Sequence, residues 1–551
     1  LTANDNAMKQ FVFFILALIT FTVRYNTVQA QAPVTTAVTD SGKQGKIIRI
    51  IAADRLNFFQ PDSLNEFQSA AGKVRIQQGT TLFDCDSVVL NKTLNMLEAF
   101  GKVHINDADS VHTYADYVRY LGKERKAYLN NNVKLTDGRG ILTTNELEYD
   151  VNSKLGIYKN GGKVVNGKTI LTSEQGWYYG ETRDIYFKRK VRLRDPQYNI
   201  TTDTLLYNTY SELATFVVPT TITTKTQKVI TKDGYYDLKN KKAYFGKRPV
   251  IQDGSTTLIA DEFASDDASG FSEARGNVII TDTAQGTQLF ANNVKANKKA
   301  GSLLATESPV AVIKQESDSI FIAADTIFSS KLSDLIPERA VRNVLFTDSV
   351  AWLDAKEVAI DSNRNRYLEA YYNVRIFSDS LQAVGDSMFY NQYDSVFRLF
   401  KNPIAWAQEN QISGDTMYLF TKNQKPHQIL VYENALTIND ANNGFLNQVR
   451  GRVITGYFID GEINFLRAKG GAETVYYPLD KENKYIGVNR ATADALEMYF
   501  ENKKLQKIKA ITELKGKMYP INQANHEALK LRGATLFTSK RPKSKYALFG
   551  E

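Results

Sequence analysis

One stretch of the sequence matches a motif that binds phosphate groups. Residues 162–169 are Gly-Lys-Val-Val-Asn-Gly-Lys-Thr and fit the pattern G-x4-G-K-[ST] of nucleotide-binding loops. Such a loop works because it leads from a strand into a helix whose N-terminal amides hold the phosphates. Here Ile170 and Leu171 follow, then Trp177-Tyr178-Tyr179, and these residue types predict another strand. We therefore do not expect a nucleotide site.

Other residue types that could support catalysis or metal binding are scattered. The four histidines have no metal-ligand spacing, and His526-Glu527 lacks the second histidine of a metalloprotease motif (His104, His112, His427, His526). No G-x-S-x-G nucleophile motif occurs. Cys85 is the only cysteine, so it cannot form an intramolecular disulfide, and we expect a small apolar side chain in a strand. The sequence predicts no enzyme and no cofactor.

Single aspartates recur about every 30 residues (Asp116, Asp203, Asp261, Asp325, Asp386, Asp415). A ladder of carboxylates suggests calcium, but calcium loops need several Asp, Asn and Gly residues close together. Asp side chains also stabilise turns by bonding to nearby backbone groups. We predict a turn or corner role for these residues.

The aspartates belong to one of two phrases that recur along the chain. The first phrase opens with Gly or Asn and continues with alternating apolar residues, as in Gly101-Lys102-Val103-His104-Ile105. Its apolar anchors are about 30 residues apart (Val74, Val103, Val133, Val164, Val191, Val250, Val278, Val310, Val374, Ile404, Leu436). The second phrase follows about a dozen residues later, as in Ala115-Asp116-Tyr117-Val118-Arg119-Tyr120.

Two strand-like phrases with one period predict one structural unit that is stacked many times. Val, Ile, Thr, Tyr and Phe crowd both phrases, and polar turn clusters separate them. The predicted fold is all-β, an elongated β-jellyroll or β-taco. Two strands per unit form two facing sheets with an apolar interior.

The N-terminal residues have the pattern of a secretory signal. Met8-Lys9, an apolar run over residues 11–23 and small residues up to Ala32 predict a cleaved signal peptide at residues 1–32, with Met8 as the expected start. A membrane anchor is the alternative, but the apolar run is too short to span a bilayer. We expect residues 33–47 to be a linker, residues 48–465 the stacked repeats, residues 466–540 a C-terminal β cap or docking region, and residues 541–551 a basic tail.

The C-terminal region is less regular. A strand is expected over residues 487–507, with a helix as the alternative for residues 493–498. A short helix is expected within residues 520–531, and residues 540–545 are expected to be a disordered basic end.

The formal net charge is +9, a small excess for 551 residues. The charges alternate with apolar residues, which is typical of a solvated strand face. A weak attraction to anionic groups such as lipid phosphates is the functional alternative. The sequence has no block of basic residues that would indicate nucleic acid binding.

Taken together, the export signal, the period and the two phrases resemble the OstA-like family. This family is related to the periplasmic lipopolysaccharide-transport proteins LptA and LptC and to the N-terminal domain of LptD. The resemblance covers about residues 48–540. The stretch from 466 to 544 is similar to the long Bacteroidota members, with Gly471-Ala472-Glu473-Thr474-Val475-Tyr476-Tyr477-Pro478 and Leu531-Arg532-Gly533-Ala534.

This resemblance implies a periplasmic protein whose apolar interior shields the acyl chains of lipid A during transport to the outer membrane. The implied partners are lipopolysaccharide and other transport proteins of the same fold, which would bind by edge-strand addition. A homo-oligomer and an association with the outer membrane are left open. The alternative function is a structural or adhesive exported β-solenoid with a closed, dry core.

The candidate groove residues are the apolar positions of the first phrase. They would contact acyl chains, although a packed-core role suits each of them equally well. They are Val74, Ile76, Val103, Ile105, Val133, Leu135, Val191, Leu193, Val278, Ile280, Val310, Val312, Val374 and Ile376.

Overall fold

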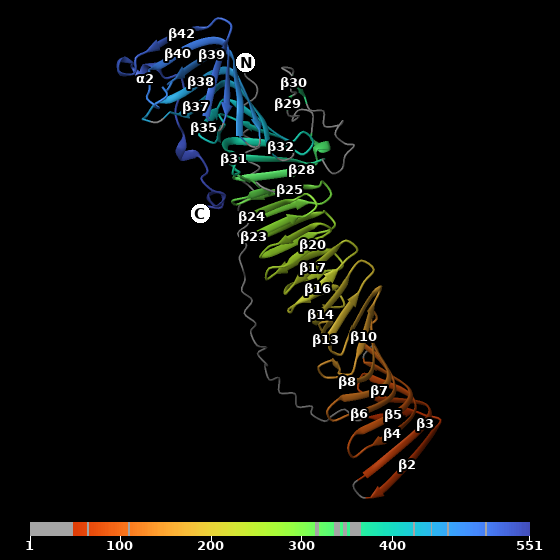
Figure 1. The fold of residues 1–551 in the computed structure, drawn as a ribbon. Coiled ribbons are helices and arrows are strands. Elements are labelled where there is room, and N and C mark those ends of the chain that lie inside the picture. The colour runs from red at the N-terminus through yellow and green to blue at the C-terminus, as the bar shows by residue number, and fades with distance from the viewer. Residues whose placement is uncertain are drawn as a thin grey trace, which may run out of the picture. The chain divides into compact units, whose positions relative to one another are not determined.

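The computed structural model describes residues 48–550, apart from residues 63–64, 108–110, 315–318, 336–341, 345–349, 353–364, 423–424, 442, 460–461 and 502–503. The predicted signal peptide and linker, residues 1–47, lie outside this part. The described residues are almost entirely strands, which confirms the predicted all-β fold of stacked strands (Figure 1). None of the described helices is long and apolar enough to cross a membrane.

The strands follow one repeated path. Some are long and bend once: β3 (Asn65–Gln78), β4 (Thr81–Asn91), β5 (Met96–Asp107), β6 (Val111–Leu121), β7 (Lys126–Thr136), β8 (Gly140–Asp150), β13 (Asp184–Arg194), β14 (Asn199–Asn208), β23 (Phe271–Asp282), β24 (Thr287–Asn297), β31 (Tyr367–Phe377), β32 (Gln382–Asn391), β37 (Lys425–Asp440), β38 (Leu446–Ile459), β39 (Glu462–Tyr476) and β40 (Val488–Glu501).

Elsewhere two short strands flank the bend: β1 (Arg49–Ala52) and β2 (Arg55–Asp62), β9 (Leu155–Tyr158) and β10 (Gly162–Asn166), β11 (Thr169–Ser173) and β12 (Gln175–Tyr179), β15 (Leu213–Phe216) and β16 (Thr220–Thr223), β17 (Gln227–Thr231) and β18 (Asp233–Asp237), β19 (Lys242–Gly246) and β20 (Val250–Asp253), β21 (Thr256–Ile259) and β22 (Glu262–Asp266), β25 (Ser302–Thr306) and β26 (Val310–Ile313), β27 (Ile320–Ala323) and β28 (Thr326–Ser330), β33 (Val396–Phe400) and β34 (Ile404–Ala407), β35 (Asn410–Ser413) and β36 (Thr416–Lys422), and β41 (Lys504–Ile511) and β42 (Lys515–Tyr519). A separate hairpin contains β29 (Arg342–Val344) and β30 (Val350–Trp352), and a short helix η1 (Leu332–Asp334) follows β28.

Because every strand path bends once, the hydrogen-bonded strands form two layers. Layer A contains one half of each path, for example residues 87–91 and 96–100, and layer B contains the other half, for example residues 74–78 and 103–107. Neighbouring strands are antiparallel in both layers. The layers face each other: Phe83 of layer B and Tyr120 of layer A have ring centroids 5.0 Å apart.

In most alternate strand paths the bend contains a corner of two consecutive residues with positive φ. At the corner of β23, Gly276 has φ 71° and Asn277 has φ 45°. Gly adopts this left-handed conformation at no steric cost, and Asn tolerates it better than most residues. The same paired conformation recurs at Gly72/Lys73, Gly101/Lys102, Asn131/Asn132, Arg189/Lys190, Lys247/Arg248, Glu307/Ser308, Tyr372/Asn373, Lys401/Asn402, Glu433/Asn434, Gly470/Gly471 and Thr512/Glu513. The Gly and Asn residues that open the first phrase therefore form the corners.

The recurring aspartates lie at the corner of the adjacent strand. Asp261 Oδ2 accepts a hydrogen bond of 2.8 Å from Asn277 Nδ2, and Asp325 accepts one of 2.8 Å from Asn373. The Asp261 backbone N–H also donates to the Gly276 carbonyl at 2.9 Å. These contacts confirm the predicted corner role of the aspartates.

A proline directly after one corner moves the valines of the first phrase to outward positions. Pro309 follows the paired corner residues Glu307 and Ser308 and takes the inward position that Val74 takes in β3. As a result Ala311 packs in the interior cluster, whereas Val310 and Val312 pack in a different cluster with Leu548. The prediction that Val310 and Val312 line the interior is wrong, because a one-residue shift in a strand reverses the face of every side chain.

The last residues return along the outer face of layer B. After β42 come η4 (Ile521–Gln523), α2 (His526–Leu529), η5 (Thr538–Lys540) and η6 (Tyr546–Leu548). Three buried glutamines bond to this segment: Gln448 accepts from Leu531 N (2.7 Å), Gln411 donates to Thr535 O (2.7 Å), and Gln382 accepts from Arg541 Nε (2.8 Å). The short helix is confirmed, and β40 is a strand as expected. The expectation of a disordered basic end is wrong.

We predict that Gly276→Ala lowers the thermal unfolding midpoint more than Gly471→Ala. Both glycines have positive φ, so both substitutions incur backbone strain of about 1–2 kcal/mol. A Cβ at Gly276 would lie 2.5 Å from Asp261 Oδ2, whereas a Cβ at Gly471 would have no atom within 4 Å. Circular dichroism melts of the two variants give the comparison, and equal midpoints would contradict the proposed corner contact.

Candidate functional site

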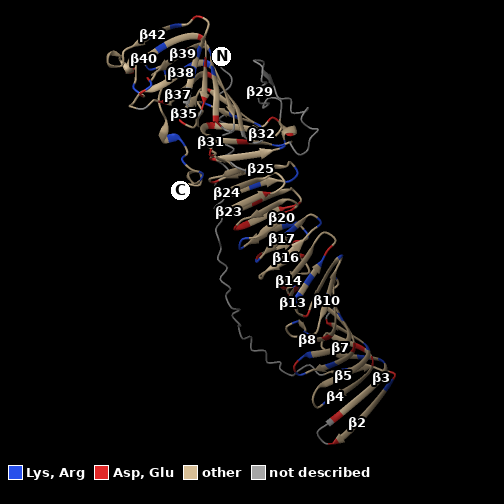
Figure 2. Ribbon diagram, viewed as in Figure 1, with Lys and Arg blue, Asp and Glu red and all other residues tan. Residues whose placement is uncertain are grey.

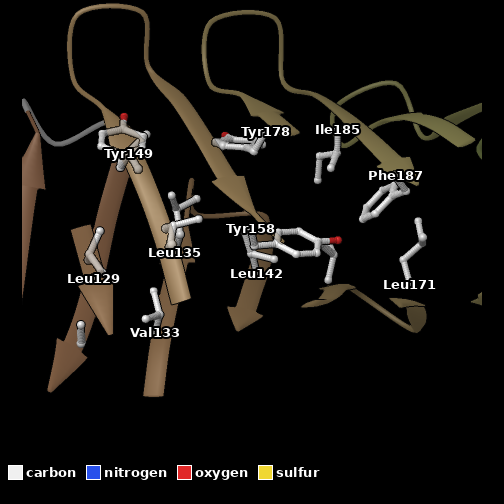
Figure 3. Close-up of a cluster of buried hydrophobic side chains, with 14 of the residues drawn as sticks. Leu129, Val133, Leu135, Leu142, Tyr149, Tyr158, Leu171, Tyr178, Ile185 and Phe187 are labelled. Atoms are coloured by element: carbon white, nitrogen blue, oxygen red, sulfur yellow. The ribbon is translucent and has the colours of Figure 1, made fainter. Parts of the chain in front are cut away.

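The candidate site is the interior between the two layers. Side chains alternate in and out along each strand, so both layers direct apolar residues to the same space. In Figure 3, Tyr178, Ile185 and Phe187 of layer A and Leu142 and Leu171 of layer B meet in this way. Over residues 74–251 the interior is one buried apolar cluster.

The predicted groove residues all come from layer B. Val74, Ile76, Val103, Ile105, Val133, Leu135, Val191 and Leu193 belong to the first buried cluster, and Val278, Val374 and Ile376 belong to a second one. Ile280 is partly buried against the second cluster, and Val310 and Val312 lie elsewhere, as described above.

Sequence reasoning missed the other half of the interior. Layer A contributes residues such as Leu97, Leu129, Phe187, Leu205 and Phe216, which are almost completely buried. The signal was present in the second phrase, where Val118 and Tyr120 alternate with Tyr117 and Arg119.

The interior is less covered in the middle of the stack. Five inward apolar side chains, which we call the port residues, are only partly buried: Leu258, Phe263, Ile280, Leu289 and Leu303. The buried core divides into its two clusters at this point, and Leu258 and Phe263 pack against both. Solvent therefore reaches apolar interior surface between β21 and β25.

A cavity opens between the layers at the C-terminal end of the stack. Its volume is about 840 Å³, and strands β39 to β42 line it. The lining is mixed, with Leu496, Ile508 and Met518 beside Thr474 and Asn489. This volume is in the range of small-molecule sites.

Apolar side chains are also exposed at the N-terminal end. Phe58 and Phe59 of β2 are 64% and 66% exposed, and Leu56 is 45% exposed. Among the described strands, β1 and β2 pair only with β3, and β41 and β42 pair only with β40. Each end of the stack thus has a free strand edge, to which another strand can bond.

A row of tyrosines closes the interior on the side opposite the corners. Tyr120, Tyr149, Tyr178, Tyr207 and Tyr236 are spaced by 29 residues, and each is the last inward residue of layer A before a hairpin turn. We call this row the tyrosine seam. Tyr178 Oη donates to Asp137 Oδ2 of layer B at 3.2 Å, and Asn166 Nδ2 of layer B donates to Tyr207 Oη at 3.2 Å.

The other members of the seam differ in their partners. Tyr120 Oη donates to Gln78 Oε1 of layer B. Tyr236 packs its ring 4.8 Å from that of Tyr198 and donates to Asp267. The Tyr149 hydroxyl is buried and has no hydrogen-bond partner among the described residues.

Burial raises the pKa of the seam tyrosines. The pKa of Tyr120 and that of Tyr207 are each raised to about 12, mainly because burial disfavours the phenolate. The pKa of Tyr178 is raised by burial and then by the nearby charge of Asp137. The seam tyrosines therefore stay neutral at neutral pH.

The phosphate-loop match, the two neighbouring histidines and Cys85 all lie in strands and hairpins of the stack. Residues 162–169 form the antiparallel hairpin of β10 and β11, with Gly167 in the turn, so no helix follows the phosphate-loop match. His104 and His112 lie 3.1 Å apart on the outside of layer B, and the described residues contain no group of three or more metal ligands. Cys85 is buried in β4, and burial raises the pKa of its thiol to about 12.

Charges lie on the outside of the stack. Figure 2 shows Lys and Arg interspersed with Asp and Glu along the described strands. Pairs such as Arg75–Asp84 and Lys190–Glu174 have nitrogen–oxygen distances of 2.6 Å, but they are exposed and contribute little stability.

Comparison with protein families gives two matches. The model of the family described as OstA-like protein matches residues 45–203 and 190–261. The model described as LptA/(LptD N-terminal domain) LPS transport protein matches residues 257–425. No curated protein sequence matches the chain.

One of the solved structures that match the chain is similar to part of it. It is LptH from Pseudomonas aeruginosa, the LptA homologous periplasmic component of the conserved lipopolysaccharide transport device. The identity is 14%, the overlap covers 26% of this chain and 81% of LptH, and the TM-score is 0.19. At this level the likeness adds nothing to the family matches.

We predict that Tyr178→Phe lowers the unfolding midpoint, whereas Tyr149→Phe leaves it unchanged or raises it. The first substitution removes a hydrogen bond to a carboxylate, worth about 1.5–3 kcal/mol, and the second removes a hydroxyl without a partner. Thermal melts of both variants test this. A larger loss in Tyr149→Phe would contradict the hydrogen-bond assignment.

We also predict a loss of stability at alkaline pH. Because the folded-state pKa of Tyr120 is raised above the ordinary value of 10.0, its contribution is complete below pH 10 and is lost as pH rises toward 12. Unfolding midpoints measured across this range should fall less in Tyr120→Phe than in Tyr210→Phe, since Tyr210 is 56% exposed. Equal pH profiles for the two variants would refute this origin of the loss.

Proposed function

Because the chain belongs to the OstA-like family of lipopolysaccharide-transport proteins, we propose that it holds the acyl chains of lipopolysaccharide in its interior during transport to the outer membrane. The observation that carries this proposal is the apolar interior shared by the two layers, which continues through both buried clusters. Its apolar lining is partly exposed at the port residues and at the C-terminal cavity.

The physical requirement for such a carrier is large. Burying one methylene group is worth about 0.8 kcal/mol, so an acyl chain of about a dozen methylenes costs on the order of 10 kcal/mol to expose to water. A continuous apolar lining lowers this cost at every position along the path. The polar head group would stay outside, next to the charged outer surface.

We propose that the free strand edges join this protein to partners. The exposed β2 edge with Phe58 and Phe59 offers both unpaired backbone groups and apolar side chains to a protein of the same fold. At the other end, residues 466–540 would end the stack or dock a further component next to the cavity. Periplasmic residence agrees with this path between two membranes.

The alternative is a structural β-solenoid with a dry core. The nearly complete burial of the interior over residues 74–251 favours it for that part of the chain. The partly exposed port residues do not fit a sealed core, because a dry core buries its apolar side chains fully.

Photo-crosslinking distinguishes the two functions. Ile280 and Thr281 are adjacent and both partly buried, but Ile280 faces the interior and Thr281 faces outward. We expect a benzophenone side chain at residue 280 to capture lipopolysaccharide in cells and one at residue 281 not to do so. Equal capture at both positions, or none at residue 280, would support the dry solenoid.

A further inference from the structure

The side of the interior opposite the corners has two different kinds of closure. Over residues 78–236 the tyrosine seam lies between the free ends of the two layers, and Tyr120, Tyr178 and Tyr207 bond across to layer B. The connecting tyrosines are buried: Tyr120 and Tyr207 are at most 1% exposed, and they bond to the buried Gln78 and the partly buried Asn166 of layer B.

The seam ends where the port residues begin. The next position in the 29-residue series after Tyr236 is Ser265, whose short side chain cannot span the two layers. Across the gap, Lys298 Nζ of layer A lies 3.3 Å from Asp253 Oδ2 of layer B. These side chains are 71% and 38% exposed, so water competes with their ion pair.

These two closures differ in how readily they open. A hydrogen bond from a buried tyrosine to a carboxylate strengthens in its low-dielectric surroundings, and breaking it exposes apolar side chains next to it. An exposed Lys–Asp pair is weak and is screened by salt. The layers therefore separate most easily at β20–β25, where apolar interior surface is already accessible.

We infer that acyl chains enter or leave the interior sideways only at the port residues, and that the tyrosine seam keeps residues 78–236 closed to sideways entry. This assignment rests on the proposed function and adds the route of the lipid. The ligand is an amphiphile with several acyl chains on one large polar head.

The seam is tested with crosslinkers at two interior positions. Val191 lies in the buried part of the interior that the tyrosine seam closes. We expect a benzophenone at residue 280 to capture purified lipopolysaccharide at least tenfold faster than one at residue 191. In the residue 191 protein, adding Tyr178→Phe should raise capture, and adding Tyr149→Phe, the matched control without a hydrogen-bond partner, should not. Equally fast capture at both positions with the seam intact would overturn the inference.

The port is tested by closing it. Asp253→Cys and Lys298→Cys are introduced together with Cys85→Ser and joined by a short bismaleimide that contains a cleavable disulfide. Capture at residue 280 should fall at least tenfold and recover after cleavage, while each single-cysteine protein treated with the reagent should capture normally. Unchanged capture in the locked protein refutes the port, even if the residue 191 variant does not fold.

The outcomes separate this inference from the proposed function. The port is refuted if the cross-link between residues 253 and 298 does not change capture at residue 280, or if residues 280 and 191 capture equally. Either result would still agree with lipid binding. A complete absence of capture at residues 280 and 191 in unlocked, folded protein refutes both.

Discussion

The paired left-handed residues at the corners of alternate strand paths are the constraint on which the rest of the structure depends. They turn these paths at the same place along the stack, and at several corners the aspartate of the neighbouring strand bonds to the turn. Because side chains alternate along a strand, a displaced corner would turn apolar residues outward. Aligned corners keep the two layers facing each other and create the interior.

The two edges of the interior are therefore unequal. At the corner edge the continuous backbone of each strand path joins the two layers, and this edge varies little along the stack. The opposite edge is closed only by side chains, and their strength varies along the stack, from buried tyrosines to an exposed ion pair between Lys298 and Asp253. The fold thus has one fixed edge and one whose opening is set by local side-chain chemistry.

Much of this could be predicted from the sequence because it is local. The period, the inward Val-x-Ile positions and the corner aspartates follow from spacing and alternation. The placement of Val310 and Val312 could not be predicted in this way. Pro309 takes the first inward position after the corner, so the two valines follow one residue later and face outward. The tyrosine seam was present in the second phrase, but its partners lie about 40 residues away and in the other layer.

The contacts of the C-terminal segment could not be predicted from local sequence patterns either, because their partners are far apart in the sequence. Gln411 and Gln382 meet residues more than a hundred positions later, and no periodicity connects them. A basic composition at a chain end predicts disorder in general. Here the buried glutamines and the apolar outer face of layer B determine its path instead.

The position of Leu548 has a consequence for biosynthesis. This residue completes an apolar cluster with Val310, Val312 and Ala323, and Phe549 packs its ring against Phe290 at 5.4 Å. The outer face of these middle strands consequently stays uncovered until residues 546–549 have been synthesised. A molecule that lacks these residues would expose this apolar patch, and such a patch is a site that chaperones and proteases can recognise.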